Sequence, residues 1–135
     1  MTYVEKQFKK VAMLAGGTGI TPFYQILQAA NENTDTPSFT LLFGNKTTQD
    51  ILLKNELDSI QQAKKFELNL NYLIDKQEPG WTGLTGYISK EMIKGKFPAP
   101  ATDTLLLICG PPVMCEKAKE IFTELNYDKE NIYEF

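Results

Sequence analysis

The sequence predicts an α/β domain of three layers, in which helices cover both faces of a doubly wound, mainly parallel five-stranded sheet. Apolar runs of strand length alternate with helical apolar patterns from residue 11 to the C-terminus, which is typical of βα units. The run Leu105-Leu106-Leu107-Ile108 is continuously apolar, as expected of a central strand with both faces buried. A length of 135 residues with 42% hydrophobic content indicates one domain over residues 1–135.

The five expected strands lie at residues 11–15, 39–44, 66–74, 104–109 and 132–135. The first helix is expected to start at Pro22, because proline is tolerated in the first turn of a helix. Its buried face carries apolar residues at helical spacing, namely Phe23, Ile26, Leu27 and Ala30. This first strand and helix form the opening βα unit of the fold.

Residues 47–50, TTQD, resemble a capping box that precedes a second helix, whose apolar face contains Leu53, Leu57 and Ile60. In the third strand, apolar residues at 66, 68, 70, 72 and 74 alternate with polar residues at 67, 69 and 71. One face of that strand is therefore expected to meet water, which places it at an edge of the sheet.

The second half of the chain begins with irregular structure. Glycines and prolines between residues 77 and 90 predict a loop that leads into a short helix at 89–94, and a further loop follows at 97–102. A last helix after Pro112 buries an apolar stripe of Met114, Ala118, Ile121, Phe122 and Leu125.

Composition excludes several classes of function. The formal net charge is −3 and all 14 basic residues are lysine, so no basic stripe predicts nucleic-acid binding. Histidine is absent, which removes histidine-based catalysis. Cys109 and Cys115 are the only cysteines, so we expect neither a metal site nor a disulfide framework.

No segment has the pattern of a membrane span or a secretory signal. The longest apolar runs have strand length, far below the roughly 20 residues that a span needs. Lysines near the N-terminus are not followed by the apolar stretch of a signal peptide. We therefore expect no membrane segment in this chain and a cytoplasmic location.

The most informative motif is a glycine-rich turn after the first strand, GGTGITP at residues 16–22. Its glycines allow backbone N–H groups to approach a phosphate closely at the start of the next helix. Pro22 stands where the GxGxxG/A fingerprint has glycine or alanine, so an ordinary Rossmann dehydrogenase is a poor match. The alternative is a tight strand-to-helix turn that binds nothing.

A second turn, CGPP at residues 109–112, follows the fourth expected strand. It leaves the Cys109 thiol at the carboxyl end of a central strand, where open α/β sheets bind ligands. In isolation, Cys109 is better explained as a small buried apolar residue. The presence of both turns at strand ends favours a single cleft formed by the two.

Together these motifs resemble the nucleotide-binding half of the ferredoxin-reductase-like flavoproteins. The likeness covers residues 10–135 and rests on the glycine turn, Asn45 with DILL at 50–53, CGPPVM at 109–114 and the terminal Phe135. NADH–cytochrome b5 reductases are the most similar members, followed by the reductase part of assimilatory nitrate reductases. Val113 replaces the third proline usual in this motif, which affects only the stiffness of the loop.

The resemblance implies that the domain positions NADH for hydride transfer to FAD, a reaction that depends on geometry more than on acid–base groups. The pyrophosphate would lie on Gly16, Gly17, Thr18 and Gly19. Cys109 and Thr21 would be the catalytic residues beside the nicotinamide. The same end of the cleft would be lined by Pro22, Gly110, Pro111, Pro112 and Met114.

At the other end, the resemblance implies that Phe43, Asn45 and Lys46 approach the adenosine. Asp75 would repel the 2′-phosphate of NADPH, unless it is merely a solvated loop residue. The absence of arginine also favours NADH, because a guanidinium is a favoured clamp for that phosphate, although Lys46 could act as a point charge. Phe135 would lie near the flavin at the domain boundary, or else pack into the core.

The resemblance further implies that the FAD-binding barrel is absent from this chain and belongs to the same full-length protein or to a partner subunit. Electrons would pass on to a haem protein such as cytochrome b5, and the full-length protein could be anchored on a membrane facing the cytosol. Three alternatives remain open. They are the reductase domain of a nitrate reductase, a non-catalytic NADH-binding module, and a relative that passes electrons from an iron–sulfur or flavin partner to NAD(P)+.

Overall fold

Strands in the order β4-β3-β2-β1-β5-β6 form one sheet in the computed structural model, which describes residues 8–32 and 36–135. All neighbouring strands are parallel. The strands are β1 (Lys10–Gly16), β2 (Ser38–Asn45), β3 (Leu68–Ile74), β4 (Leu84–Thr85), β5 (Thr104–Cys109) and β6 (Ile132–Glu134). The sheet of the described residues therefore has six strands, not the five expected.

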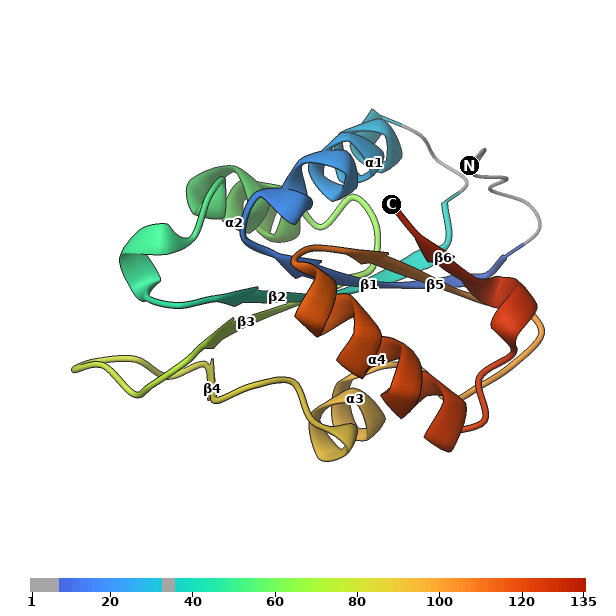
Figure 1. Ribbon diagram of the computed structural model, residues 1–135. Coiled ribbons are helices and arrows are strands. Elements are labelled where there is room, and N and C mark those ends of the chain that lie inside the picture. The colour runs from blue at the N-terminus through green and yellow to red at the C-terminus, as the bar shows by residue number, and fades with distance from the viewer. Residues whose placement is uncertain (1–7, 33–35) are drawn as a thin grey trace.

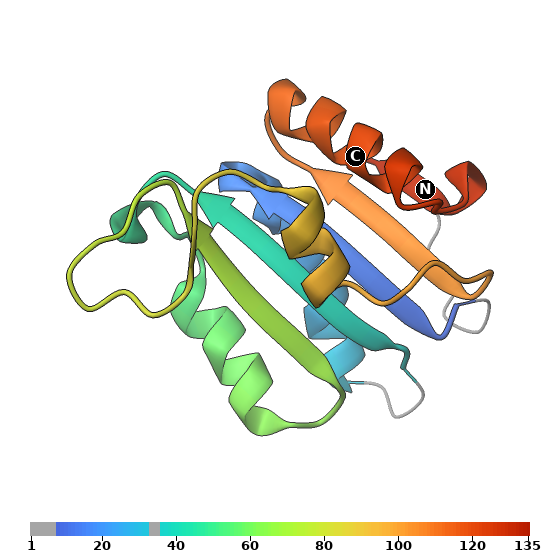
Figure 2. The same ribbon diagram turned by 90° about the horizontal axis from the view of Figure 1, so that it is seen from below.

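Helices cover both faces of this sheet, which confirms the three-layer prediction. They are α1 (Ile20–Glu32), α2 (Lys54–Ala63), α3 (Lys90–Lys96) and α4 (Pro112–Glu124). Figure 1 shows α1 and α2 on one face and α3 and α4 on the other, and Figure 2 shows the same layers from below. Short 3-10 turns are η1 (Gly17–Gly19), η2 (Thr48–Asp50) and η3 (Lys129–Asn131).

The core is divided by the sheet into two layers of buried side chains. Val11 and Met13 of β1 point into the layer beneath α1 and α2, whereas Ala12 and Leu14 point into the layer beneath α3 and α4. All four are at most 1% exposed, as are Leu106 and the next two residues of β5. Both central strands thus bury both faces, as their continuous apolar sequences predict.

The edge of the sheet differs from the expectation. β4 pairs only with Leu73 and Ile74, so the edge position expected of β3 holds only for residues 68–72. β3 also begins at Leu68, and Phe66 instead packs edge-on against Phe39 with ring centroids 5.5 Å apart. A strand of two residues has no periodicity in the sequence, which is why β4 was not expected.

Two helix starts also differ from the expectation. α1 begins at Ile20 rather than Pro22, so Pro22 lies within the first turn, where its missing N–H breaks no helical hydrogen bond. The capping box is present, with the Thr47 N–H and hydroxyl donating to Asp50 at 3.2 and 2.9 Å. It closes η2, and α2 starts separately at Lys54 after Leu53, which has φ 59°.

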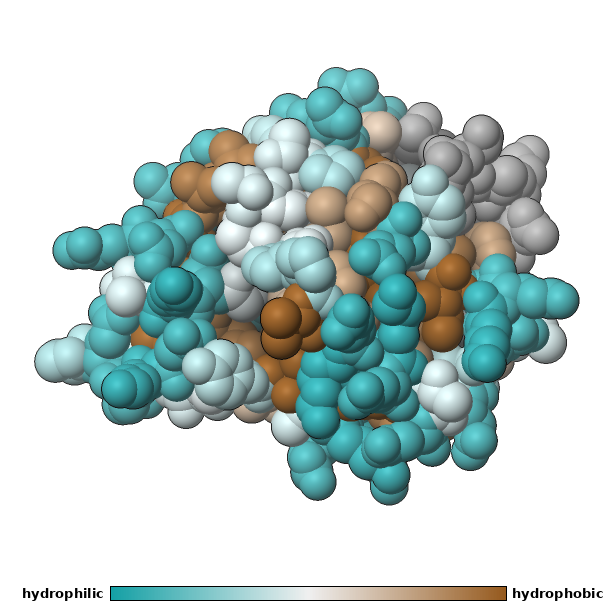
Figure 3. Space-filling view, in the orientation of Figure 1, coloured by the Kyte–Doolittle hydropathy of each residue, from teal (hydrophilic) through white to brown (hydrophobic). Residues whose placement is uncertain are grey.

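The surface is mainly hydrophilic on the face seen in Figure 3, with small separate apolar patches. Val113, at the start of α4, is 80% exposed. Within the described residues no helix is both long and apolar enough to cross a membrane.

Candidate functional site

The two glycine-containing turns lie against each other at the carboxyl edge of the sheet. Ala15 of β1 is in register with Cys109 of β5, so the strands end side by side. A Cβ atom on Gly19 would lie 2.2 Å from the carbonyl oxygen of Cys109, and a Cβ on Gly110 would lie 3.1 Å from the amide nitrogen of Gly16. No larger residue fits at Gly19, because the obstacle there is backbone. The structure therefore brings together the two turns that the sequence singled out.

The first turn is open to solvent at Gly17 and Thr18, whereas Gly16 and Gly19 are buried. Gly17 has φ +55°, and a Cβ there would meet no atom within 4 Å, so its outer side is open. Thr18 and Thr21 are exposed, and the Thr21 hydroxyl donates to the Thr18 carbonyl at 3.2 Å. η1 runs directly into the 13-residue α1, which has no acidic residue in its first turn. Helix starts have N–H groups without intrahelical partners, and together with the helix dipole they make this end attractive to an anion.

The second turn is fixed by α4. Pro111 caps this helix, and Pro112 is its first residue. The side chain of Met114 covers Gly16, since a Cβ on that glycine would lie 2.8 Å from the methionine sulfur. These contacts explain the need for Gly16 and Gly110 and leave Cys109 half-exposed at the end of β5.

The Cys109 thiol is held in its neutral form. Burial raises its pKa above the ordinary thiol value, and the Glu134 carboxylate raises it further. Glu134 itself accepts a hydrogen bond from Lys119 at 2.6 Å, which lowers the pKa of that carboxyl. A neutral thiol contacts a ligand as a compact, weakly polar group and is a poor nucleophile.

The carboxyl ends of β2 and β3 lie on the same side of the sheet as the two turns. The Asp75 N–H donates to the Lys46 carbonyl at 3.2 Å, so these residues are neighbours. Lys46 is exposed and Asp75 half-exposed. Asn45 is 9% exposed, and its Nδ2 atom is buried with no hydrogen-bond partner among the described residues. An orphaned buried donor at a strand end is a site feature that a ligand acceptor could satisfy.

Phe43 does not face this edge. It is fully buried, with its ring 6.3 Å from that of Tyr72 in the core. Its side chain therefore offers no surface to a nucleotide, and the expected contact with adenosine is wrong for this side chain. Period-two alternation places Phe43 and Asn45 on the same side of β2, but only the last residue reaches the end of the strand.

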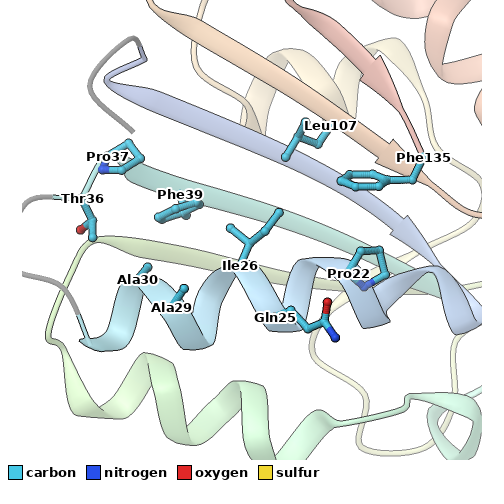
Figure 4. Close-up of a pocket in the computed structure, with 10 residues that line it drawn as sticks. All are labelled: Pro22, Gln25, Ile26, Ala29, Ala30, Thr36, Pro37, Phe39, Leu107 and Phe135. Atoms are coloured by element: carbon cyan, nitrogen blue, oxygen red, sulfur yellow. The ribbon is translucent and has the colours of Figure 1, made fainter. Parts of the chain in front are cut away.

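Phe135 lies between β5 and α1, the helix that follows the first turn. Its N–H donates to Ile108 at 2.9 Å, and its ring meets Phe23 edge-on with centroids 5.5 Å apart. The side of α1 that faces β5 and the C-terminus borders an apolar groove of about 300 Å3, and Figure 4 shows Phe135, Leu107 and Ile26 directed into it. Pro22 lines the end of the groove near the glycine turn, and Phe135 is 47% exposed.

A family model described as the oxidoreductase NAD-binding domain matches residues 13–120, a range that contains both glycine turns and Asp75. The chain belongs to this family.

Curated relatives of this oxidoreductase NAD-binding domain include two NADH-cytochrome b5 reductases. NADH-cytochrome b5 reductase 2 of Debaryomyces hansenii is 38% identical over 96% of the chain and 48% of the relative. NADH-cytochrome b5 reductase 1 of Eremothecium gossypii is 42% identical over 94% of the chain and 45% of the relative. The chain thus spans about half the length of the relatives it matches.

Solved structures give the same result. The cytochrome b5 reductase domain of Ulva prolifera nitrate reductase superposes with a TM-score of 0.89 at 31% identity, over 95% of this chain and 50% of that one. The CS-b5R domains of human Ncb5or in the NAD+ form superpose with a TM-score of 0.83 at 30% identity, over 96% of this chain and 37% of that one. The ferredoxin-reductase-like fold expected from the sequence is therefore confirmed.

The residues of the oxidoreductase NAD-binding domain fit the dinucleotide that the family name implies. The open backbone at Gly17 and the start of α1 suit a pyrophosphate, and the orphaned Asn45 amide lies at a neighbouring strand end. Two further candidate site residues, Tyr87 and Glu78, are evident only in the structure.

Tyr87 is 81% exposed and directly follows Gly86, whose N–H donates to the Asp75 carbonyl. The Glu78 carboxylate accepts a hydrogen bond from the Thr48 hydroxyl. No sequence pattern predicts either residue as part of the site, because both lie in irregular segments.

Proposed function

We propose that residues 1–135 are the NADH-binding half of a flavin-dependent oxidoreductase of the cytochrome b5 reductase type. The contact between the turns at Gly19 and Gly110 is the observation that supports it most strongly. Because of this contact, the start of α1, which attracts anions, lies next to the end of β5, which carries a neutral thiol. NADH has matching parts, since its pyrophosphate is negatively charged and its reduced nicotinamide ring is uncharged.

In this proposal the first turn binds the pyrophosphate. The N–H groups of Gly17, Thr18 and Gly19 would donate to its oxygens, with the hydroxyl of Thr18 as a further donor. Gly16 would keep Met114 close enough to close the turn on its inner side. The α1 dipole adds a favourable interaction with the negative charge.

The nicotinamide end would lie between the two turns. When bound, NADH supplies a hydride from its nicotinamide ring, and the residues of this chain position that ring. Cys109 and Thr21 would contact it, and the neutral state of the thiol avoids a charge beside the ring. The walls of this end would be Pro22, Gly110, Pro111, Pro112 and Met114.

The adenosine end would lie over β2 and β3. Asn45 and Lys46 would bind the ribose side, where Asp75 disfavours a 2′-phosphate. The exposed ring of Tyr87 would offer a stacking surface for adenine, since Tyr87 follows Gly86, whose N–H donates to the Asp75 carbonyl. NADH is therefore the nucleotide that we propose, rather than NADPH.

FAD would be carried by a second domain, in the same full-length protein or in a partner subunit. Pro22, Phe135 and the apolar groove between them border the nicotinamide end, so this face is the one proposed to meet the flavin. The electrons would then reach a haem protein such as cytochrome b5, the acceptor named by the curated relatives. We propose that this domain works in the cytoplasm, whether or not the full-length protein is anchored to a membrane.

A second candidate function is the reductase domain of a nitrate reductase. The superposition on the Ulva prolifera domain with a TM-score of 0.89 supports it. The site would perform the same step in both cases, and the two differ in the final acceptor.

Titration of the purified chain with NADH tests the proposal. We expect quenching of Trp81 fluorescence or enhancement of NADH fluorescence with saturation, and no reduction of ferricyanide until a flavin-loaded FAD domain of a cytochrome b5 reductase is added. Ferricyanide reduction by the chain and NADH alone would contradict the need for a flavin partner. Absence of saturable NADH binding would contradict the proposed function itself.

A further inference from the structure

Glu78 joins the two loops at the adenosine end of the proposed site. Its Oε2 atom accepts the Thr48 N–H at 3.1 Å, and its Oε1 atom accepts the Thr48 hydroxyl at 2.7 Å. Thr48 follows β2, whereas Glu78 follows β3, so one carboxylate connects residues 30 positions apart in the chain. Such a two-oxygen contact determines both the position and the orientation of the carboxylate.

The loop that carries Glu78 is rigidified by its own hydrogen bonds. The Trp81 N–H donates to the Glu78 carbonyl at 3.0 Å, and the Gln77 amide donates to the carbonyls of Glu78 and Trp81 at 2.9 and 2.7 Å. The indole N–H of Trp81 in turn donates to Leu84 of β4 at 2.9 Å. The negative charge of Glu78 is therefore held in place rather than free to turn away.

The hydrogen-bond donors of the segment after β2 are already bonded to carboxylates. Asp50 accepts hydrogen bonds from the N–H and hydroxyl of Thr47, and Glu78 accepts them from the N–H and hydroxyl of Thr48. Asp75 lies beside Lys46 through its backbone hydrogen bond. A phosphate that approached Lys46 would meet these carboxylates and would find the threonine donors taken.

We propose that Glu78 is a second specificity-determining residue, which acts with Asp75 to exclude nucleotides that carry a 2′-phosphate. This inference rests on the proposed nucleotide site. Glu78 acts in two ways, since its charge repels the phosphate and its hydrogen bonds remove the donors that could bind it. NADH has a ribose hydroxyl at that position and is affected by neither.

Calorimetric titration of the chain with NADH and with NADPH tests the role of Glu78. Glu78→Gln removes the charge and keeps one carbonyl acceptor for Thr48, and Glu78→Ala frees both donors. We expect Glu78→Gln to lower the preference for NADH over NADPH about fivefold, mainly through tighter NADPH binding, and Glu78→Ala to lower it at least as much. The control is Glu120→Gln, which removes an exposed carboxylate of α4 and should leave the preference unchanged.

The outcomes separate this inference from the function on which it depends. If the unaltered chain binds neither nucleotide, the proposed function fails. If the unaltered chain prefers NADH and Glu78→Gln keeps the same ratio, or weakens both nucleotides equally, Glu78 only holds the loops together and the inference fails. Circular dichroism melting of each variant shows whether the fold is retained.

Discussion

Gly19 illustrates how one missing side chain allows the two turns to meet. A Cβ atom there would lie within 2.6 Å of both the oxygen and the carbon of the Cys109 carbonyl, and neither can move without shifting β5. Gly17 is needed for a different reason, because its φ of +55° is unfavourable for residues with a side chain. The site thus depends on the absence of atoms at one glycine and on backbone conformation at another.

Gly19→Ala should therefore lower the free energy of unfolding by about 3 kcal/mol or more, because the clash is with backbone. Gly44→Ala is the matched control, since a Cβ there has its closest neighbour at 3.8 Å and should cost less than about 1 kcal/mol. Urea unfolding of both variants measures the difference. Equal stabilities for the two variants would mean that the turns are not in contact.

The reactivity of Cys109 depends on its surroundings. Because burial and Glu134 raise its pKa, alkylation by iodoacetamide should be slow at neutral pH and rise only in alkaline solution. Glu134→Gln should lower the pKa and accelerate alkylation at a given pH. NADH should protect Cys109, as measured by peptide mass spectrometry, whereas an alkylation rate unaffected by NADH would contradict a nicotinamide contact. Cys115, which is 2% exposed, should stay unmodified throughout.

Elements of the sheet are stabilised by specific side-chain links as well as by their core. The Tyr72 hydroxyl of β3 donates to Asp58 of α2 at 2.7 Å, and Lys54 completes the group with an ion pair to Asp58 at 2.8 Å. Burial raises the pKa of Tyr72, and the hydrogen bond and charge of Asp58 raise it further. This group ties α2 to β3, beside the proposed adenosine end.

The raised pKa of Tyr72 predicts how stability changes in alkaline solution. The unfolded chain loses the tyrosine proton near the ordinary value of 10.0, whereas the folded chain keeps it, so the free energy of unfolding falls as pH rises above that value. Tyr72→Phe should reduce this fall, and should cost about 1 kcal/mol near neutral pH through the lost hydrogen bond. Tyr87→Phe, at an exposed ring, is the control for urea unfolding at both pH values. An unchanged alkaline slope in Tyr72→Phe would contradict the shift.

The sequence predicts most of the helices and strands, and the differences from the structure have physical reasons. Continuous apolar runs identify β1, β2 and β5, and apolar residues at helical spacing identify α1, α2 and α4, because burial on one or two faces leaves a pattern in the sequence. β4 has two residues and leaves none. The start of α2 depends on a left-handed Leu53, a conformation that no propensity of leucine predicts.

The residues of the candidate site, too, can be predicted from the sequence only where their pattern is local. Gly16–Gly19 and Cys109 can be predicted as site residues from the sequence because turn chemistry is local to their motifs. Tyr87 and Glu78 are not, because their roles depend on hydrogen bonds to residues far away in the chain. The predicted contact of the Phe43 side chain is wrong because alternation gives the side of a strand that a residue faces but not how far it lies from the end of the strand.

For the whole molecule, the charge distribution predicts nucleotide choice. The chain contains no arginine, and Asp75 lies beside Lys46 at the adenosine end. Asp75→Ser should strengthen NADPH binding about tenfold with little change for NADH, because a close like charge is removed. Parallel calorimetric titrations measure the ratio, with Asp103→Ser as a control at the opposite edge of the sheet. An unchanged ratio would show that Asp75 has no part in selectivity.

The residues that line the groove along α1 do not include the carboxyl ends of β2 and β3. We propose that one dinucleotide spans the carboxyl ends of the strands, from Cys109 to Asp75. The most direct measurement is an NMR titration of the 15N-labelled chain with NADH. We expect the largest amide shifts at Gly17, Gly19 and Gly110, with a second group at Lys46 and Asp75. Shifts confined to the α1 groove, or none with NADH in large excess, would contradict it.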